Sequence, residues 1–169
     1  MSSPVWTAEL VTADVELTRA TAAEIGRTLA AGDVLLLTGE LGAGKTTFTQ
    51  GLGVGLGVRS GIISPTFVLV RIHPSITDGP QLVHVDAYRL TSAGEIDDLD
   101  LESTLDTSVT VIEWGEGRAE HLSPNRLHIH LARPTGGELP DFEADDDEPR
   151  TLQIEAFGPR WEGQRIQLG

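Results

Sequence analysis

The sequence predicts an α/β domain in which helices flank a central, mixed β-sheet. Short apolar runs of strand length alternate with helical patterns, which is typical of a largely buried sheet. A glycine-rich loop joins one of these runs to a helix. Two strand-like segments then follow each other near the C-terminus, which indicates an antiparallel edge.

The first half of the chain supplies the elements around the glycine-rich loop. We expect an edge strand at residues 6–14, where apolar and polar side chains are mixed. Thr21, with Glu24 three residues later, has capping-box spacing, so a helix is expected to begin there. Residues 34–37 form a continuous apolar run, as in a strand buried on both faces. A helix is predicted at residues 46–52, after the loop.

The second half supplies most of the strands. We predict them at residues 67–72, 82–86, 109–113, 127–131 and 151–156. The acidic stretch 95–105 is predicted to be a short helix. Polar and apolar residues alternate cleanly at 127–131, so this strand should have one wet face and could pair with 151–156.

Length and composition favour one cytoplasmic domain spanning residues 1–169. A chain of 169 residues can bury a sizeable core, and it contains no cysteine for a disulfide or a thiolate site. No apolar run is long enough to span a bilayer, and the N-terminal residues lack the pattern of a signal peptide. We therefore expect no membrane association.

The charge is strongly acidic, with a formal net charge of −14. Because nucleic-acid binders gain affinity from Lys and Arg, strong direct binding to nucleic acid is not expected. A partner with a basic surface fits better. Residues 138–148 contain seven acidic residues, and we interpret them as a solvated hairpin loop, with a docking segment as the alternative.

Residues 39–46, GELGAGKT, match the phosphate-binding pattern G-x-x-x-x-G-K-[ST] in full. Glycines let backbone N–H groups approach phosphate oxygens, and the N-terminus of the following helix favours the same anion. Lys45 would place its charge on the β- and γ-phosphates of ATP, and the Thr46 hydroxyl could ligate Mg²⁺. With a buried strand before it and a helix after it, the motif predicts a three-layer P-loop NTPase fold.

Acidic residues end two of the predicted strands. Asp86 follows residues 82–85 and Glu113 follows 109–112, at the sheet edge where α/β proteins bind ligands. We expect Glu113 to hold the metal and Asp86 to orient water. Thr66, after Pro65, could place a hydroxyl near the γ-phosphate or serve only in a turn.

One tryptophan and three histidines each allow more than one position or role. Trp114 is expected in the core rather than beside the nucleotide. His84 should point away from Val83 and Val85, toward the site or another polar contact. His128 and His130 share a strand face and could bind zinc, although solvent exposure is the commoner reason for this pattern.

Four segments together resemble the TsaE family, the P-loop ATPases of bacterial tRNA threonylcarbamoyladenosine biosynthesis. They are GELGAGKTT at 39–47, SPTF at 64–67, HVDAYRL at 84–90 and IEW at 112–114. The order and spacing are those of the family, and the resemblance covers roughly residues 21–131. The acidic insert at 138–148 and the tail after Phe157 depart from the simplest pattern of the family.

The resemblance implies an ATPase that binds the TsaD and TsaB transferase pair and resets it between turnovers, without transferring the threonylcarbamoyl group itself. The implied cofactors are ATP and Mg²⁺. The implied ATP-binding residues are Glu40, Leu41, Gly42, Ala43, Gly44, Lys45, Thr46 and Thr47. Thr46 and Glu113 would be the metal ligands, with Asp86, Glu113 and Thr66 acting in hydrolysis.

Two other functions use the same phosphate loop. A small-molecule or nucleotide kinase usually has an arginine-rich lid, whereas residues 95–106 contain no Arg or Lys. Arg71, Arg89 and Arg118 remain scattered candidates for such a clamp. A non-enzymatic switch would bind nucleotide without positioning water. A GTPase is disfavoured because the chain has no Asn-Lys-x-Asp segment.

Overall fold

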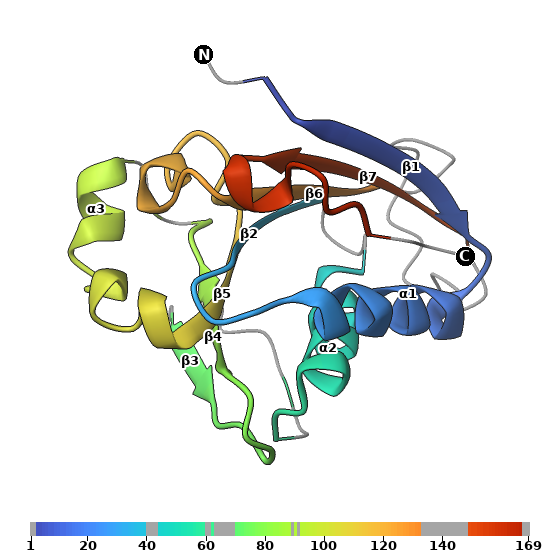
Figure 1. The fold of residues 1–169 in the computed structure, drawn as a ribbon, viewed down its shortest axis with the longest axis horizontal. Coiled ribbons are helices and arrows are strands. Elements are labelled where there is room, and N and C mark those ends of the chain that lie inside the picture. Colours follow the sequence, from blue (N-terminus) through green and yellow to red (C-terminus); the bar gives the residue numbers. More distant parts are fainter. Residues whose placement is uncertain are drawn as a thin grey trace.

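The computed structural model describes residues 3–39, 44–59, 62, 70–88, 90, 92–132 and 149–166. These residues form a seven-stranded sheet with the order β1-β7-β6-β2-β5-β4-β3. Figure 1 shows the sheet and the helices around it. The strands are β1 (Trp6–Thr12), β2 (Val34–Gly39), β3 (Val70–His73), β4 (Gln81–Asp86), β5 (Ser108–Glu113), β6 (Arg126–Ala132) and β7 (Arg150–Phe157).

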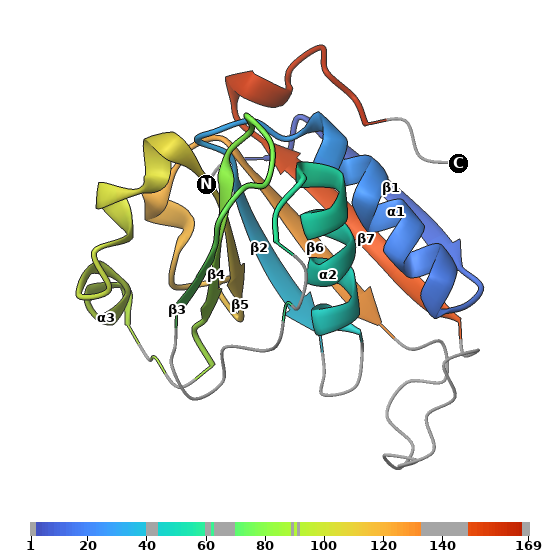
Figure 2. The same cartoon turned by 90° about the horizontal axis from the view of Figure 1, so that it is seen from below.

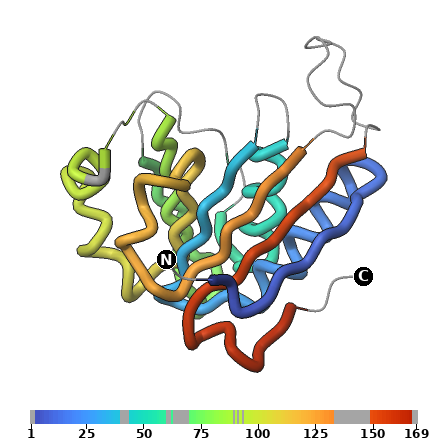
Figure 3. The backbone as a smooth tube through the Cα atoms, turned by 90° about the horizontal axis from the view of Figure 1, so that it is seen from above, coloured from blue at the N-terminus to red at the C-terminus, as the bar shows by residue number. Residues whose placement is uncertain are grey.

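The sheet is mixed, as predicted. Strands β6, β2, β5 and β4 run parallel, whereas β3, β7 and β1 each run antiparallel to their neighbours. Figure 3 shows β6, in orange, between β2, in light blue, and β7, in red. The predicted pairing of the last two strands is confirmed, and β1 is an edge strand beside β7.

Helices cover both faces of the sheet. The helices are α1 (Val15–Thr28), α2 (Lys45–Leu56) and α3 (Ala93–Asp97), with 3₁₀ turns at Leu101–Ser103, Leu105–Thr107, Glu120–Leu122 and Pro159–Trp161. Figure 2 shows α1 and α2 side by side on one face. Leu35 and Leu37 of β2 pack in the core beneath them, whereas Val34 and Leu36 pack with Ile96 of α3 on the other face. Strand β2 is therefore buried from both sides, and the fold has three layers.

Helix α1 begins earlier than the sequence predicted. Asp14 is its N-cap, because its Oδ1 accepts a hydrogen bond from the Leu17 N–H at 2.8 Å. The prediction that the helix begins at Thr21 is wrong. Thr21 is buried within the helix, so its spacing to Glu24 is not a capping box here.

The helix predicted at residues 95–105 is also wrong in length. Helix α3 ends at Asp97, and Asp100 then adopts a left-handed conformation with φ of 54°. Since a left-handed residue ends a right-handed helix, the segment continues as two 3₁₀ turns. Ser92 caps α3 by accepting from the Glu95 N–H at 3.3 Å.

Helices α1 and α2 pack at very short range because glycines face the contact. A Cβ built on Gly55 would lie 2.2 Å from the carbonyl oxygen of Ala23. No side chain larger than hydrogen fits there without movement of the backbone. This contact fixes α2, whose first turn carries the phosphate-loop lysine, against the rest of the fold.

None of the helices in the described ranges combines the length and apolar character needed to cross a bilayer.

Candidate functional site

The pattern at residues 39–46 begins with the last residue of β2 and ends in the first turn of α2. Gly44 is the N-cap of α2 and has φ of 100°, a left-handed conformation that favours glycine. Gly44 has no side chain to cap the first turn, and the N-terminus of a helix favours an anion. Lys45 is the first residue of α2, and Thr46 and Thr47 follow it on the same half-buried turn. The sequence therefore correctly predicted the strand before the motif and the helix after it.

Lys45 lies at the carboxyl end of the parallel strands. Its Nζ donates a hydrogen bond to the Gly39 carbonyl oxygen and lies 4.5 Å from the centroid of the Trp114 ring. Burial lowers the pKa of Lys45, and the nearby carboxylates of Glu113 and Asp86 oppose that shift. The ammonium group is thus held between an aromatic face and two acids.

The two acids occupy neighbouring strand ends, as predicted. Asp86 is the last residue of β4 and Glu113 the last of β5, and the two are paired in register. Both are buried, with exposed fractions of 8% and 4%. Asp86 Oδ1 accepts from the Tyr88 N–H at 2.9 Å, which turns the chain after the strand. The site thus brings two carboxylates and one ammonium together.

His84 has a partner that the sequence did not reveal. Its Nε2 lies 2.6 Å from Glu113 Oε2, and both side chains are buried. The expectation that His84 points away from Val83 and Val85 to a polar contact is confirmed. The partner could have been found from strand pairing, since His84 lies two residues before Asp86 and so shares its face.

Trp114 is not a core residue, so that expectation is wrong. It is half-buried and has φ of 62°, and its ring lies tilted against the Tyr88 ring, with 5.3 Å between the centroids. The backbone N–H of Trp114 donates to the Leu37 carbonyl oxygen at 2.9 Å. This bond and the left-handed backbone turn the indole toward Lys45 rather than into the core.

Several predicted positions lie outside the described residues. They are Glu40, Leu41, Gly42, Ala43, Thr66 and Arg89, together with the acidic loop at 138–148. Of the other two candidate clamp arginines, Arg118 donates to the carbonyl oxygens of Trp114, at 2.9 Å, and Ala87, at 3.3 Å. Arg71 belongs to β3, where its Nε is buried.

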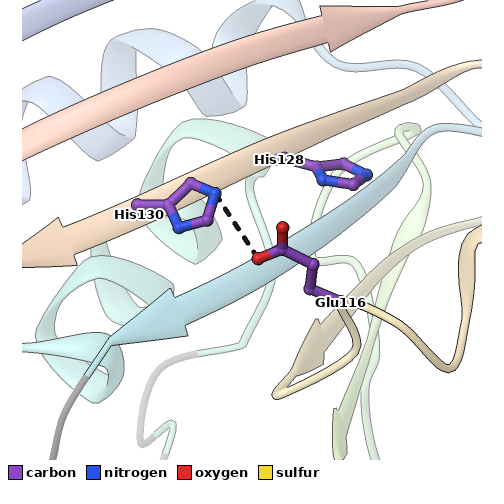
Figure 4. A group of neighbouring side chains, drawn as sticks. All are labelled: Glu116, His128 and His130. Atoms are coloured by element: carbon purple, nitrogen blue, oxygen red, sulfur yellow. Dashed lines mark ion pairs between the residues drawn. The ribbon is translucent and has the colours of Figure 1, made fainter. Parts of the chain in front are cut away.

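A second cluster of titratable side chains lies near β2, outside this site. Figure 4 shows Glu116, His128 and His130, whose nearest ligand atoms lie within 4.8 Å of one another. Arg126 Nε, however, donates to His128 Nε2 at 2.9 Å, and burial, aided by Arg126, lowers the pKa of His128. A neutral His128 that accepts at Nε2 carries its proton on Nδ1, so neither nitrogen offers a lone pair to a metal. The arrangement does not favour the zinc site considered from the sequence.

The wet face predicted for residues 127–131 is only partly present. His130 is half-buried, whereas His128 is 5% exposed. The centroid of the Phe157 ring lies 4.6 Å from that of the His128 ring, a contact that the alternating pattern of β6 alone could not show.

A known family and several known proteins match most of the chain. The family model described as Threonylcarbamoyl adenosine biosynthesis protein TsaE matches residues 12–138. A tRNA threonylcarbamoyladenosine biosynthesis protein TsaE from Streptomyces coelicolor is 52% identical over 143 residues, 82% of this chain and 92% of that protein. The protein of the same name from Bacillus subtilis is 39% identical over 133 residues, 78% of this chain and 74% of its own.

A solved structure also matches. The crystal structure of Bacillus subtilus YdiB superimposes with a TM-score of 0.69 and 32% sequence identity, and the match covers 94% of this chain and 90% of that one. The predicted α/β fold is therefore confirmed both by the sheet and by a related structure.

Proposed function

The chain belongs to the TsaE family of threonylcarbamoyl adenosine biosynthesis proteins, and we propose that it is a Mg²⁺-dependent ATPase that supports threonylcarbamoyl transfer to tRNA. One observation carries the proposal. Lys45, at the start of α2, lies beside the buried carboxylates of Asp86 and Glu113 at adjacent strand ends. This arrangement suits a polyphosphate with a divalent cation.

The residues fit magnesium chemically. Mg²⁺ prefers oxygen ligands, and the first turn of α2 offers the Thr46 hydroxyl while β5 offers the Glu113 carboxylate. Two buried carboxylates beside one ammonium leave negative charge that a cation would offset. Bound Mg²⁺ would neutralise part of the charge on the β- and γ-phosphates.

The side chains and backbone of the site would bind the phosphates and position the attacking water. Residues 40–47 would cradle the phosphates with backbone N–H groups, and Lys45 would offset charge on the γ-phosphate. Asp86, with Thr66, would accept hydrogen bonds from a water molecule and hold it in line with the leaving oxygen of ADP. The α2 N-terminus adds a positive dipole end on the same side.

The proposed partners are the TsaD and TsaB transferase pair. The TsaE names of the relatives place them in the biosynthesis of the modified tRNA nucleoside. A chain with a net charge of −14 is better suited to docking on a protein with a basic surface than to binding tRNA directly.

Reconstitution tests the pathway. With TsaD, TsaB, tRNA and a source of threonylcarbamoyl-AMP, repeated rounds of tRNA modification are expected only when this chain and ATP are both present. Incorporation of labelled threonine into tRNA measures the rounds. Full multiple-turnover modification in the absence of the chain would contradict the proposal.

Asp86→Ala separates the ATPase from a nucleotide-binding switch. If hydrolysis is the function, this variant should bind ATP yet fail to support repeated modification. Full support of modification without hydrolysis would make the chain a switch. Transfer of labelled γ-phosphate to an acceptor other than water would indicate a kinase instead.

A further inference from the structure

A buried histidine contacts the Glu113 carboxylate. His84 is 0% exposed and contacts Glu113 Oε2 through its Nε2 at 2.6 Å. The two residues belong to adjacent parallel strands, β4 and β5. The sheet itself therefore fixes the distance between them.

The chemistry of the contact defines the direction of the hydrogen bond. A carboxylate only accepts, so His84 donates from Nε2 to Oε2. His84 Nδ1 is buried and has no hydrogen-bond partner within the described ranges. The contact to Glu113 is therefore the polar interaction that sets the orientation of this ring, and reciprocally the ring holds one oxygen of the carboxylate.

We propose that His84 is a positioning residue that holds the Glu113 carboxylate in the orientation needed to bind Mg²⁺ beside the nucleotide phosphates. This inference rests on the proposed function, which assigns Glu113 to the metal. With Oε2 engaged by His84, the carboxylate loses its freedom to rotate and can present Oε1 toward the side of Lys45. His84 itself touches neither the nucleotide nor the metal.

His73 provides a matched control in the same layer. It lies on β3, which pairs with β4, and is 2% exposed. Its ring centroid is 6.5 Å from that of His84. Within the described residues, its ring nitrogens have no hydrogen-bond partner. Replacing His73 thus removes a buried imidazole from the same face without removing a bond to Glu113.

The experiment measures binding of a non-hydrolysable ATP analogue by isothermal titration calorimetry, over a series of Mg²⁺ concentrations. His84→Leu should raise the Mg²⁺ concentration needed for tight binding by about 10- to 100-fold, the usual effect of losing a group that orients a ligand. His84→Gln can place its amide N–H near the position of Nε2 and should recover most of the loss. His73→Leu should leave the Mg²⁺ dependence unchanged.

Thermal unfolding of each variant separates positioning from packing. Should His84→Leu not fold, His84→Asn replaces it, because its shorter amide does not reach Glu113. Unchanged Mg²⁺ dependence in His84→Leu or His84→Asn would overturn the proposal. The proposal would also be overturned if His84→Gln and His73→Leu both needed as much extra Mg²⁺ for tight binding as His84→Leu does, since the effect would then follow packing alone.

Phosphate release measured on the same samples keeps the two proposals distinguishable. If the wild-type chain binds the analogue in a Mg²⁺-dependent way but releases no phosphate from ATP, hydrolysis fails while the role of His84 is still decided by binding. If binding by the wild-type chain does not depend on Mg²⁺, Glu113 does not hold the metal and the role of His84 is overturned.

Discussion

At the scale of single residues, Lys45 places a positive charge at the start of α2, within the candidate site. It is the only lysine in the chain, and its ammonium group lies between the Trp114 ring and two buried acids. Burial disfavours the charge, whereas the acids and a bound polyphosphate would favour it. We therefore expect Lys45 to contribute to binding rather than to folding.

Lys45→Ala should weaken ATP binding by about 10- to 100-fold, because charge-assisted hydrogen bonds to phosphate are each worth about 1.5–3 kcal/mol. Thermal unfolding should change little. Titration with a fluorescent ATP analogue measures the affinity. Arg19→Ala, which removes a surface cation on α1, is the control and should bind as the wild type does.

Because Lys45 is the only lysine, an amine-acylating reagent offers a direct check on its place in the site. Mg·ATP should protect Lys45 from acylation, since the phosphates would cover its Nζ. Mass spectrometry of the digested protein reads the modification. Equal labelling with and without Mg·ATP would mean that nucleotide does not contact this side chain.

The pKa of His73 predicts how the stability of the fold depends on pH. Burial, with help from His84 and two arginines, lowers the pKa of His73 below its ordinary value of 6.5. As the pH falls, the unfolded chain therefore takes up a proton at His73 at a higher pH than the folded chain does. The contribution of the neutral His73 to the free energy of unfolding is fully present above pH 6.5, and it is lost as the pH falls through the lower, folded-state pKa.

Urea denaturation at pH 7.5 and 5.5 measures the consequence. The free energy of unfolding should fall less between these two pH values in His73→Leu than in the wild type. An identical fall in both proteins would show that His73 does not contribute to acid sensitivity.

At the scale of elements, the close packing of α1 and α2 holds the phosphate-loop helix in place. Gly55→Ala would put a methyl group against the Ala23 carbonyl oxygen and should destabilise the fold by about 1–3 kcal/mol, as overpacking usually does. Urea denaturation measures the change. Gly94→Ala in α3 is the control, because the nearest atom to its added Cβ is Ser92 Oγ at 3.8 Å. Equal stability of the two variants would contradict the account of this contact.

Strands were easier to predict from the sequence than helix ends. The apolar runs at residues 34–37 and 109–113 could be read as strands because burial on both faces leaves few polar positions. The start of α1 was missed because Asp14 and Thr21 both have capping chemistry, and only the packed structure decides between them. The early end of α3 depends on the backbone conformation of Asp100, for which an aspartate among other acids gives little signal.

The candidate site was predictable where it depends on chain order. The strand before the P-loop pattern, the helix after it and the acids at the strand ends follow from spacing, and these positions are confirmed. The contact between His84 and Glu113 and the exposure of Trp114 depend on strand register and on one left-handed residue. Neither can be read from a local pattern.

At the scale of the whole molecule, the C-terminal segment closes the fold. Arg160 donates two hydrogen bonds to Asp33, from Nε to Oδ1 at 3.0 Å and from Nη2 to Oδ2 at 3.1 Å, and a further one to the Thr28 carbonyl oxygen. Asp33 is 4% exposed, and the neighbouring Trp161 is fully buried in the main core. Residues far apart in the sequence are thereby joined at the turn before β2.

Arg160→Ala should lower the free energy of unfolding by about 2 kcal/mol, less than for a fully buried pair because Arg160 is partly exposed. The loss arises because Asp33 would stay buried without its partner. Arg27→Ala is the control, since its pair with Glu24 is exposed and should contribute about 0.5 kcal/mol or less. Comparable losses in both variants, measured by urea denaturation, would contradict a special role for Arg160.

We propose that the site at the carboxyl edge of the sheet hydrolyses ATP in support of a transferase. Phosphate release from ATP, measured for the chain alone and with a TsaD–TsaB pair added, tests it most directly. We predict that the pair stimulates release by the wild-type chain and that Lys45→Ala abolishes the stimulated release. Release that the pair leaves unchanged, or that persists in Lys45→Ala, would contradict the claim.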